Sequence, residues 1–412
     1  MMAKNSSKES IGLKEMLDVR EDLYRYWLYS IDGIGKKAIG ILTEAIGKPK
    51  DIYNASEKQL ASLLTQKQIQ LFKKARAELD PGRMFEDLQK NNIRFVPRES
   101  PKFPDKLRTI PDSPYALYVK GGLPDSERPS VAIIGARLCS EYGRYMARVF
   151  GQELGAMGFQ VISGMATGID GIAEKAAFQA GGTSFSVLGC GVDICYPPEN
   201  TDLYEMCVQR GGLISEYPPG TVPRPQLFPP RNRIISGLAD AVLVIEARAK
   251  SGTLITVDMA LEQGRDVYVL PGRVTDRLSD GCNALLKQGA LIATCAADIA
   301  EDLYGRRQGT GDVLSQKSDI AEQINQGVVS EQHDNQTGLP YEPGKFDSSD
   351  PGMVSAVVLY VLDVTPKTIG DIEAALAHKD IHIPPSQLMC TMVDLELCGR
   401  VYREGASYSL KY

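Results

Sequence analysis

Histidine, which often serves as a general base or a metal ligand, is scarce in this sequence. The 412 residues contain three, His333, His378 and His382. All three follow the segment 130–292, in which short apolar runs alternate with amphipathic stretches. A histidine general base or histidine metal ligand within that segment is therefore excluded.

Paired cysteines and long apolar runs are missing as well. None of the eight cysteines forms a Cys-x-x-Cys pair, so neither a zinc site nor a redox motif is indicated. No uninterrupted apolar run reaches the roughly 18 residues that a membrane helix needs. The first residues, MMAKNSSKES, lack the apolar core of a signal peptide. We therefore expect a cytoplasmic protein without membrane insertion.

An excess of basic residues is also lacking. The formal net charge is −6 at pH 7, which counts against a protein coated in nucleic acid. Segment 224–287 differs from the whole chain, because it holds nine basic residues against seven acidic ones. The composition thus leaves room for one narrow basic groove.

The length predicts more than one domain. A segment rich in Gln, Ser, Asp, Gly and Asn, with few large apolar residues, is typical of a linker. We expect a disordered tail at 1–20, a small helical domain at 21–90, a central α/β domain at 91–305, a linker at 306–350 and a winged helix at 351–412.

The central domain is predicted to hold a mostly parallel sheet. Its expected strands are short, continuous apolar runs, as in a sheet covered by helices on both faces. A further strand, Pro114–Val119, leads into them. The fold class is α/β, an extended Rossmann-like, doubly wound sheet. The expected strands lie at 131–134, 159–162, 184–188, 212–214, 241–246, 266–270 and 290–292.

The two flanking domains give weaker signals. In the first, the Gly-Ile-Gly-Lys of Ile31–Lys37 resembles a helix-hairpin-helix turn that contacts a DNA phosphate, but a plain turn between helices is favoured because the motif is short. In the last, a stripe of valines at 354, 357, 358 and 361 and a terminal hairpin predict a winged helix. Its five basic and seven acidic residues argue against tight DNA binding and equally favour protein docking.

The first turn of the central domain, Gly135-Ala136-Arg137, follows a strand and opens a helix. A dinucleotide fingerprint needs glycines two and five positions after Gly135, where the chain has Arg137 and Ser140. Nicotinamide or flavin binding is therefore disfavoured, and no other cofactor is indicated. An arginine at this place suits phosphates of a polynucleotide backbone.

Five such loops follow strand ends, and the carboxyl ends of parallel strands meet at one edge of a sheet. Three of the loops carry cations, which predicts a ligand with several anionic groups. The loops are Gly135–Arg137, Ser163–Asp170, Gly189–Asn200, Phe228–Ile235 and Ala249–Thr256.

Several motifs occur in a fixed order along these loops: Gly-Ala-Arg, S-G-M-A-x-G-I-D, F-P-x-R-N-R-I-I-x-G-L, S-G-T-L-I-T and G-C-N-x-L-x-x-x-G-A. With them the chain resembles the bacterial DNA-processing protein A family (DprA, or Smf) over roughly residues 100–300. The resemblance implies a domain that binds single-stranded DNA without sequence preference, as in natural transformation. It also implies a homodimer and a contact with the RecA recombinase, which the protein loads onto the strand.

The resemblance also implies which residues meet the DNA. The family's arginine corresponds to Arg137, after Gly135 and Ala136, and its second basic motif to Arg231, Asn232 and Arg233. Lys250 adds a cation, while Ser163, Gly164, Ser251, Gly252 and Thr253 supply amides and hydroxyls. Phe228 is either a core residue or a platform for bases.

Two alternatives stay open. Arg231 and Arg233 could instead start a helix and pair with local carboxylates such as Asp240 or Glu246. The Ser251–Thr253 turn with Glu262 is a faint echo of nucleotide N-glycosidases of the phosphoribohydrolase type, an enzymatic alternative. Because no loop offers clustered carboxylates or a Cys/His set for a metal, we predict that the protein is not an enzyme and holds no metal.

Overall fold

The computed structural model describes residues 21–308, 351–362, 366–379, 381–398 and 400–410. The chain divides into two compact units. The first contains the residues up to Leu138 together with Ala147–Tyr304, and the second contains Cys139–Met146 and the residues from Gly305 onward. Within the described ranges, no helix combines the length and the apolarity needed to cross a bilayer.

Residues 21–90 form a helical bundle around the fully buried Trp27, whose ring meets Phe72 edge-on at 5.1 Å between centroids. Leu28 and Ile31 are buried beside Trp27. Gly33 adopts a positive φ of 86° in the turn before α2, and whether that turn contacts DNA stays a prediction. The helices are 21–29, α2 (Lys36–Ile46), α3 (Pro49–Asn54), α4 (Glu57–Ala61), α5 (Gln66–Glu78) and α6 (Pro81–Lys90).

A nine-stranded sheet organises the rest of the first unit, with strand order β1-β2-β6-β5-β4-β3-β7-β8-β9. The seven strands from β3 onward are parallel, and β1 and β2 add an antiparallel edge. The sequence predicts the parallel strands to within two residues at each end but misses β1, which ends in Pro97. The strands are β1 (Ile93–Pro97), β2 (Ala116–Gly121), β3 (Ser130–Ile134), β4 (Gln160–Ser163), β5 (Thr183–Val187), β6 (Gly212–Ser215), β7 (Ala241–Val244), β8 (Asp266–Val269) and β9 (Leu291–Ile292).

The chain order reverses between β3 and β7. From β3 the chain runs outward through β4, β5 and β6, then returns to pair β7 on the other side of β3, with Val131 opposite both Val161 and Ala241. Ligands of doubly wound sheets bind beyond the carboxyl ends of the strands at such a switch point. The loops after β3 and β7 carry Arg137 and Lys250.

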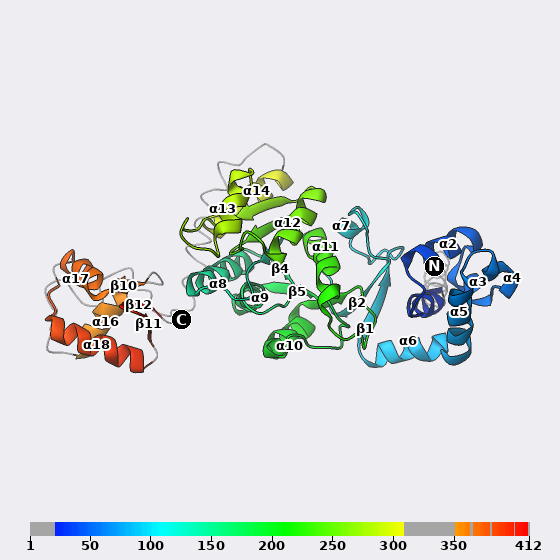
Figure 1. Ribbon diagram of the computed structural model, residues 1–412, viewed down its shortest axis with the longest axis horizontal. Coiled ribbons are helices and arrows are strands. Elements are labelled where there is room, and N and C mark those ends of the chain that lie inside the picture. Colours follow the sequence, from blue (N-terminus) through cyan, green and yellow to red (C-terminus); the bar gives the residue numbers. More distant parts are fainter. Residues whose placement is uncertain (1–20, 309–350, 363–365, 380, 399, 411–412) are drawn as a thin grey trace, which may run out of the picture. The chain divides into compact units, whose positions relative to one another are not determined.

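Helices connect the parallel strands and lie around them (Figure 1). One expectation is wrong: Phe228–Ile235 is not a loop but the first two turns of α11, because Pro229 and Pro230 fit the first positions of a helix. The helices are α7 (Asp105–Arg108), α8 (Glu141–Ala156), α9 (Ile169–Gln179), α10 (Thr201–Arg210), α11 (Phe228–Leu238), α12 (Gly252–Glu262), α13 (Asp280–Lys287) and α14 (Ala296–Gln308), with 3-10 turns at Pro198–Asn200 and Pro225–Leu227.

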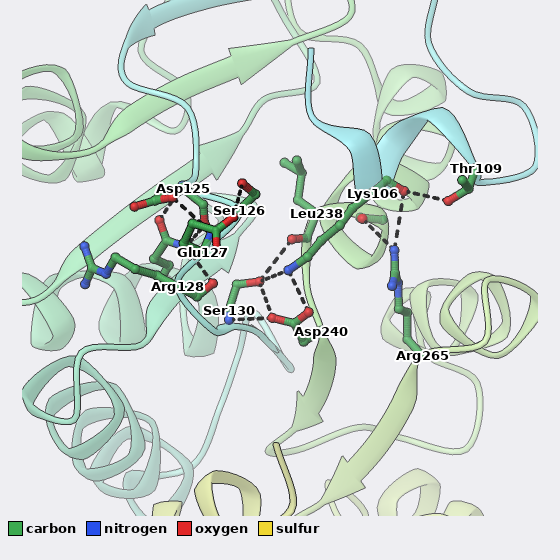
Figure 2. Close-up of polar contacts among 12 residues, drawn as sticks. Lys106, Thr109, Asp125, Ser126, Glu127, Arg128, Ser130, Leu238, Asp240 and Arg265 are labelled. Atoms are coloured by element: carbon green, nitrogen blue, oxygen red, sulfur yellow. Dashed lines mark hydrogen bonds and ion pairs between the residues drawn. The ribbon is translucent and has the colours of Figure 1, made fainter. Parts of the chain in front are cut away.

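At the amino ends of β3 and β7, a polar network fixes the start of both strands (Figure 2). Lys106 Nζ lies 2.7 Å from Asp240 Oδ1 and donates to Ser130 Oγ at 2.9 Å. The Ser130 amide donates to Asp240 Oδ2 at 2.9 Å. The segment that carries α7 is thereby fastened to both central strands, at the edge opposite the switch-point loops.

The second unit contains α16 (Pro351–Val361), β10 (Lys367–Thr368), α17 (Ile369–Ala377), α18 (Pro385–Leu397), β11 (Val401–Glu404) and β12 (Ser407–Leu410). Its strands form a sheet of order β10-β12-β11. The predicted valine stripe is confirmed, because Val354, Val357 and Val358 are fully buried. Three helices and a terminal hairpin are present as expected, and the assignment to the winged-helix class stays a prediction. The expected tail at 1–20 and most of the expected linker at 306–350 lie outside the described residues.

Candidate nucleic-acid groove

Two adjoining cavities open at the carboxyl edge of the sheet. The larger has a volume of about 620 Å³ and the smaller about 280 Å³. Together they form what we call the groove, and both are lined by Arg137, Ala166, Tyr196, Phe228 and Arg231. The larger cavity extends over the loops after β3 and β7 to the start of α12. The groove therefore lies at the switch point.

Phe228 stands between the two cavities. Its half-buried ring stacks on Tyr196, with centroids 5.7 Å apart and planes 27° from parallel. The guanidinium carbons of Arg137 and Arg231 lie 5.5 and 5.7 Å from its centroid. A Cβ on Gly189 would come within 2.6 Å of the ring, so only glycine leaves room for it there. Whether Phe228 serves as a platform for bases stays a prediction.

Three exposed cations line the larger cavity: Arg137, Arg248 and Lys250. None of them makes an ion pair within 4.0 Å with a carboxylate of the described residues. The sequence indicated Arg137 and Lys250 but not Arg248, although its position two residues before Lys250 in the same loop is the signal that could have found it. In the described part of the groove, these three positive charges are thus not neutralised by an ion pair.

The turn that holds Arg137 is packed against the next turn along the sheet. The Ile169 amide donates to the Ala136 carbonyl at 3.2 Å, and Ile169 fills the space beside Gly135. Gly168 has a φ of 79°, and a Cβ there would lie 2.3 Å from the Ala136 oxygen. Gly135 and Ala136 therefore contribute through their backbone, which holds in place the turn that carries Arg137.

Arg231 differs from the exposed cations because it is 4% exposed. Its Nη1 donates to the carbonyls of Gly164, at 3.1 Å, and Val187, and its Nε donates to Asn232 Oδ1 at 3.2 Å. Burial lowers the pKa of Arg231, while nearby Asp170 acts in the opposite direction. Arg231 is thus a buried charge beneath Phe228.

Arg233 lines neither cavity. Its side chain is 6% exposed, with Nη2 2.8 Å from both carboxylate oxygens of Glu216 and Nε 3.1 Å from Asp112 Oδ2. The expected pairing with a carboxylate of its own fold is present, but not with Asp240, which pairs with Lys106. The structure therefore does not bring Arg233 together with the other predicted contacts.

The predicted phosphate donors at Ser163 and Gly164 are used inside the protein. Ser163 is fully buried and its hydroxyl donates to the Ile133 carbonyl at 2.6 Å. The Gly164 amide donates to the Asp170 carboxylate, whose pKa is raised by burial and lowered by Arg231. These two residues lie under the groove and hold its floor.

The turn before α12 does face the larger cavity. Ser251 caps the helix, accepting from the Thr253 amide at 3.2 Å. Thr253 Oγ1 donates to the Gly135 carbonyl at 3.2 Å and so joins the loops after β3 and β7. Ser251, Gly252 and Thr253 line the cavity beside Lys250.

The residues of the glycosidase alternative are not brought together. Glu262 is the last residue of α12, whose first residue is Gly252. Ten residues of helix place it about 15 Å along the axis from that turn, and it lines neither cavity. Among the described residues, no group of three or more His, Cys, Asp or Glu side chains is arranged to hold a metal ion.

Comparisons with known proteins point to one family. Residues 94–304 match the family model described as DNA recombination-mediator protein A. The chain is 42% identical to protein Smf of Escherichia coli over 217 residues, which are 52% of this chain and 58% of that protein. It is 42% identical to DprA of Streptococcus pneumoniae over 197 residues, 48% of this chain and 70% of that protein. The X-ray structure of DprA from Streptococcus pneumoniae is 32% identical, with a TM-score of 0.58, over 68% of this chain and 96% of that one.

Proposed function

Because the chain belongs to the DNA recombination-mediator protein A family, we propose that it binds single-stranded DNA in the groove and loads the RecA recombinase onto the bound strand. The observation that carries the first part is Phe228, a partly exposed ring that stacks on Tyr196 and has the guanidinium groups of Arg137 and Arg231 close to it. Loading of RecA is proposed from the family resemblance. The family's description as a recombination mediator supports it, and it is tested separately.

The groove favours a single strand over a duplex for a physical reason. Aromatic rings bind nucleic acid by stacking on base faces, which a single strand exposes and a duplex hides. The exposed cations Arg137, Arg248 and Lys250 lie along the same groove and can contact the phosphates. Stacking and phosphate contacts are both insensitive to base identity, so we propose binding without sequence preference.

We propose that the strand stays uncut. A general acid or base must reach the reacting atom with a pKa near the working pH. Asp170 lines the larger cavity but is 8% exposed and accepts from the Gly164 amide beside Arg231. That carboxylate is committed to the fold, and Glu262 stands away from the groove. Both placements support a binding protein rather than a glycosidase.

We further propose a homodimer, as the family resemblance implies. The edge strand β9 supports it, because Leu291 is 38% exposed and Ile292 59% exposed. An edge strand with apolar side chains in water is a template for pairing with another chain. Sedimentation at micromolar concentration is the check, and a species of only 45.0 kDa contradicts a dimer.

The experiment that tests the function is filter binding with labelled single- and double-stranded oligonucleotides, together with nucleoside monophosphates, with and without magnesium. The expected result is retention of intact single strands in preference to duplex. Equal retention of both argues against the aromatic platform. Release of free base that disappears in a Glu262→Gln variant favours the glycosidase instead. For the mediator step, the protein is expected to raise the rate at which RecA coats a single strand.

A further inference from the structure

The Ser163–Asp170 loop looks from its sequence like a phosphate cradle, but its Gly164 and Met165 amides are already bound inside the protein. The Gly164 amide donates to the Asp170 carboxylate. The next amide, that of Met165, donates to Glu174 Oε2 at 3.0 Å. Both acceptors lie on α9, the helix that this loop opens. Two of the amides that such a turn offers to an anion are thus bound by carboxyl groups of the chain itself.

Glu174 is fully buried in a polar cluster. Its Oε1 contacts the hydroxyls of Ser186 and, at 3.4 Å, Ser184, both on β5. Cys207 of α10 lies beside Ser186, with Oγ and Sγ 3.3 Å apart. No ion pair joins Glu174 to a described basic side chain within 4.0 Å. Burying a carboxyl group without a salt bridge lowers the stability of the fold, so such a group is expected to have a role.

One peptide group connects Glu174 to the groove. The Met165 amide that donates to Glu174 belongs to the same peptide unit as the Gly164 carbonyl, which accepts from Arg231 Nη1 at 3.1 Å. Met165 has a φ of 55°, a backbone conformation that residues other than glycine rarely adopt. Asn200 Nδ2 donates to the Met165 carbonyl at 2.9 Å and holds the other side of this residue. The strained loop is therefore fixed by its partners.

The charges of the cluster also constrain it. Asp170, Glu174 and Arg231 are each no more than 8% exposed, so two carboxyl groups share one buried guanidinium. Buried charges are normally paired, and Asp170 is the strongest of the charges that raise the pKa of Arg231. Charge balance then leaves a proton on Glu174. Burial, opposed by the Ser186 hydrogen bond and reinforced by Asp170, raises its pKa from 4.5 to about 8.

We propose that Glu174 is a positioning residue of the groove: through the Gly164–Met165 peptide group it fixes Arg231, and with it the ring of Phe228. The proposal rests on the proposed function, because its effect is measured as single-strand binding. It assigns the phosphates of the strand to the exposed cations and not to the Gly164 and Met165 amides. Glu174 itself touches no DNA.

The test compares the wild-type protein with Glu174→Gln and Glu174→Ala in the full chain. Binding of a fluorescent oligo-dT is followed by anisotropy at pH 7 and pH 9, and amide hydrogen exchange at Met165 is followed without DNA. Glutamine retains an acceptor for Met165 and a donor for Ser186, so it should bind within about twofold of wild type and keep Met165 protected. Alanine should expose the Met165 amide to exchange and weaken binding about tenfold, as loss of one stacked base does.

The pH profile distinguishes positioning from simple packing. Glu174 faces Asp170 on α9, Ser184 and Ser186 on β5, Met165 in the loop, Cys207 on α10 and Arg231 on α11. The folded pKa is raised, so the stabilising proton is fully present below pH 4.5 and is lost as the pH rises through about 8. Wild-type binding and stability should therefore fall between pH 7 and pH 9, whereas Glu174→Gln should stay level.

Three results overturn the proposal. The first is a folded Glu174→Ala variant that binds oligo-dT as tightly as wild type, and the second is an equal loss of affinity in the Gln and Ala variants. The third is the same pH dependence of binding in wild type and Glu174→Gln. If Glu174→Ala fails to fold, the pH profile and the Met165 exchange of Glu174→Gln still decide. Failure of the proposed function is recognised separately, because wild type then fails to bind oligo-dT while the Met165 exchange pattern remains as expected.

Discussion

The two edges of the central sheet both carry cations but use them differently. At the amino edge, Lys106 pairs with Asp240, and Arg265 donates to the carbonyls of Gly237 and Lys106 at 3.0 and 3.4 Å (Figure 2). At the carboxyl edge, Arg137 and Lys250 are exposed in the groove without a described ion pair. The cations at the amino edge bind groups of the protein and join its segments, whereas those at the carboxyl edge are available to bind a ligand. A basic residue is therefore a candidate for phosphate binding only where no carboxylate of the fold neutralises it.

The largest expected effect is on stability at the amino edge. Asp240→Ala removes the partner of Lys106 and leaves the Ser130 amide without its acceptor. Loss of such partly buried bonds should lower the free energy of unfolding by about 2–3 kcal/mol, with little change in the DNA affinity of the folded protein. Asp105, exposed and paired only with Arg108 three residues on, is the matched control: Asp105→Ala should change stability by less than about 0.5 kcal/mol. Urea unfolding of both variants is the measurement, and equal stabilities contradict the structural role of this edge.

Next in size is the effect of Phe228→Ala on single-strand affinity. Loss of one stacked base should weaken binding about tenfold, while duplex binding changes less. Tyr402→Ala removes an exposed ring of the second unit, 48% exposed, and should leave affinity unchanged. Competition binding with single- and double-stranded oligonucleotides measures both. If Phe228→Ala binds single strands as tightly as wild type, the ring has only a structural role.

The comparison of edges also explains what the sequence could and could not predict. The parallel strands and the groove-lining turns are local signals, because short apolar runs end in glycine-rich turns. Arg233 could not be told from Arg231 in this way, since its partners Glu216 and Asp112 are 17 and 121 residues distant in the chain. The Ser163–Asp170 loop differs, because Glu174 is only nine residues from Met165 in the chain. Its role as an acceptor for that loop could not be predicted, because it depends on the buried cluster that Glu174 forms with Ser184 and Ser186 of β5.

Smaller still is the contribution of each exposed cation of the groove. Arg137→Ala, Arg248→Ala and Lys250→Ala should each reduce the slope of log affinity against log salt by about 0.7, the value for one phosphate contact on a single strand. Lys74, exposed on α5 and paired with Glu78, is the control whose removal should leave the slope as it is. A slope that does not respond to any of the three groove variants places the phosphates elsewhere.

The smallest expected effect is that of removing residues 309–412. A chain that ends at Gln308, the last residue of α14, should bind single strands within about twofold of the full chain. The reason is that the C-terminal segment 351–412 carries seven acidic residues against five basic ones. Anisotropy titration at matched salt measures it, and collapse of binding in a truncated chain that still unfolds cooperatively assigns part of the DNA site to the removed segment.

The most direct test of the groove as the DNA site is zero-length ultraviolet crosslinking of oligo-dT to the full chain, with the linked peptides mapped by mass spectrometry. Because bases are expected to stack at the ring pair, the crosslinks should fall on the peptides that contain Phe228 and Tyr196 and should diminish in Phe228→Ala. Crosslinks concentrated instead in the second unit, or at the Ile31–Lys37 turn, with none at Phe228 or Tyr196, would contradict the account.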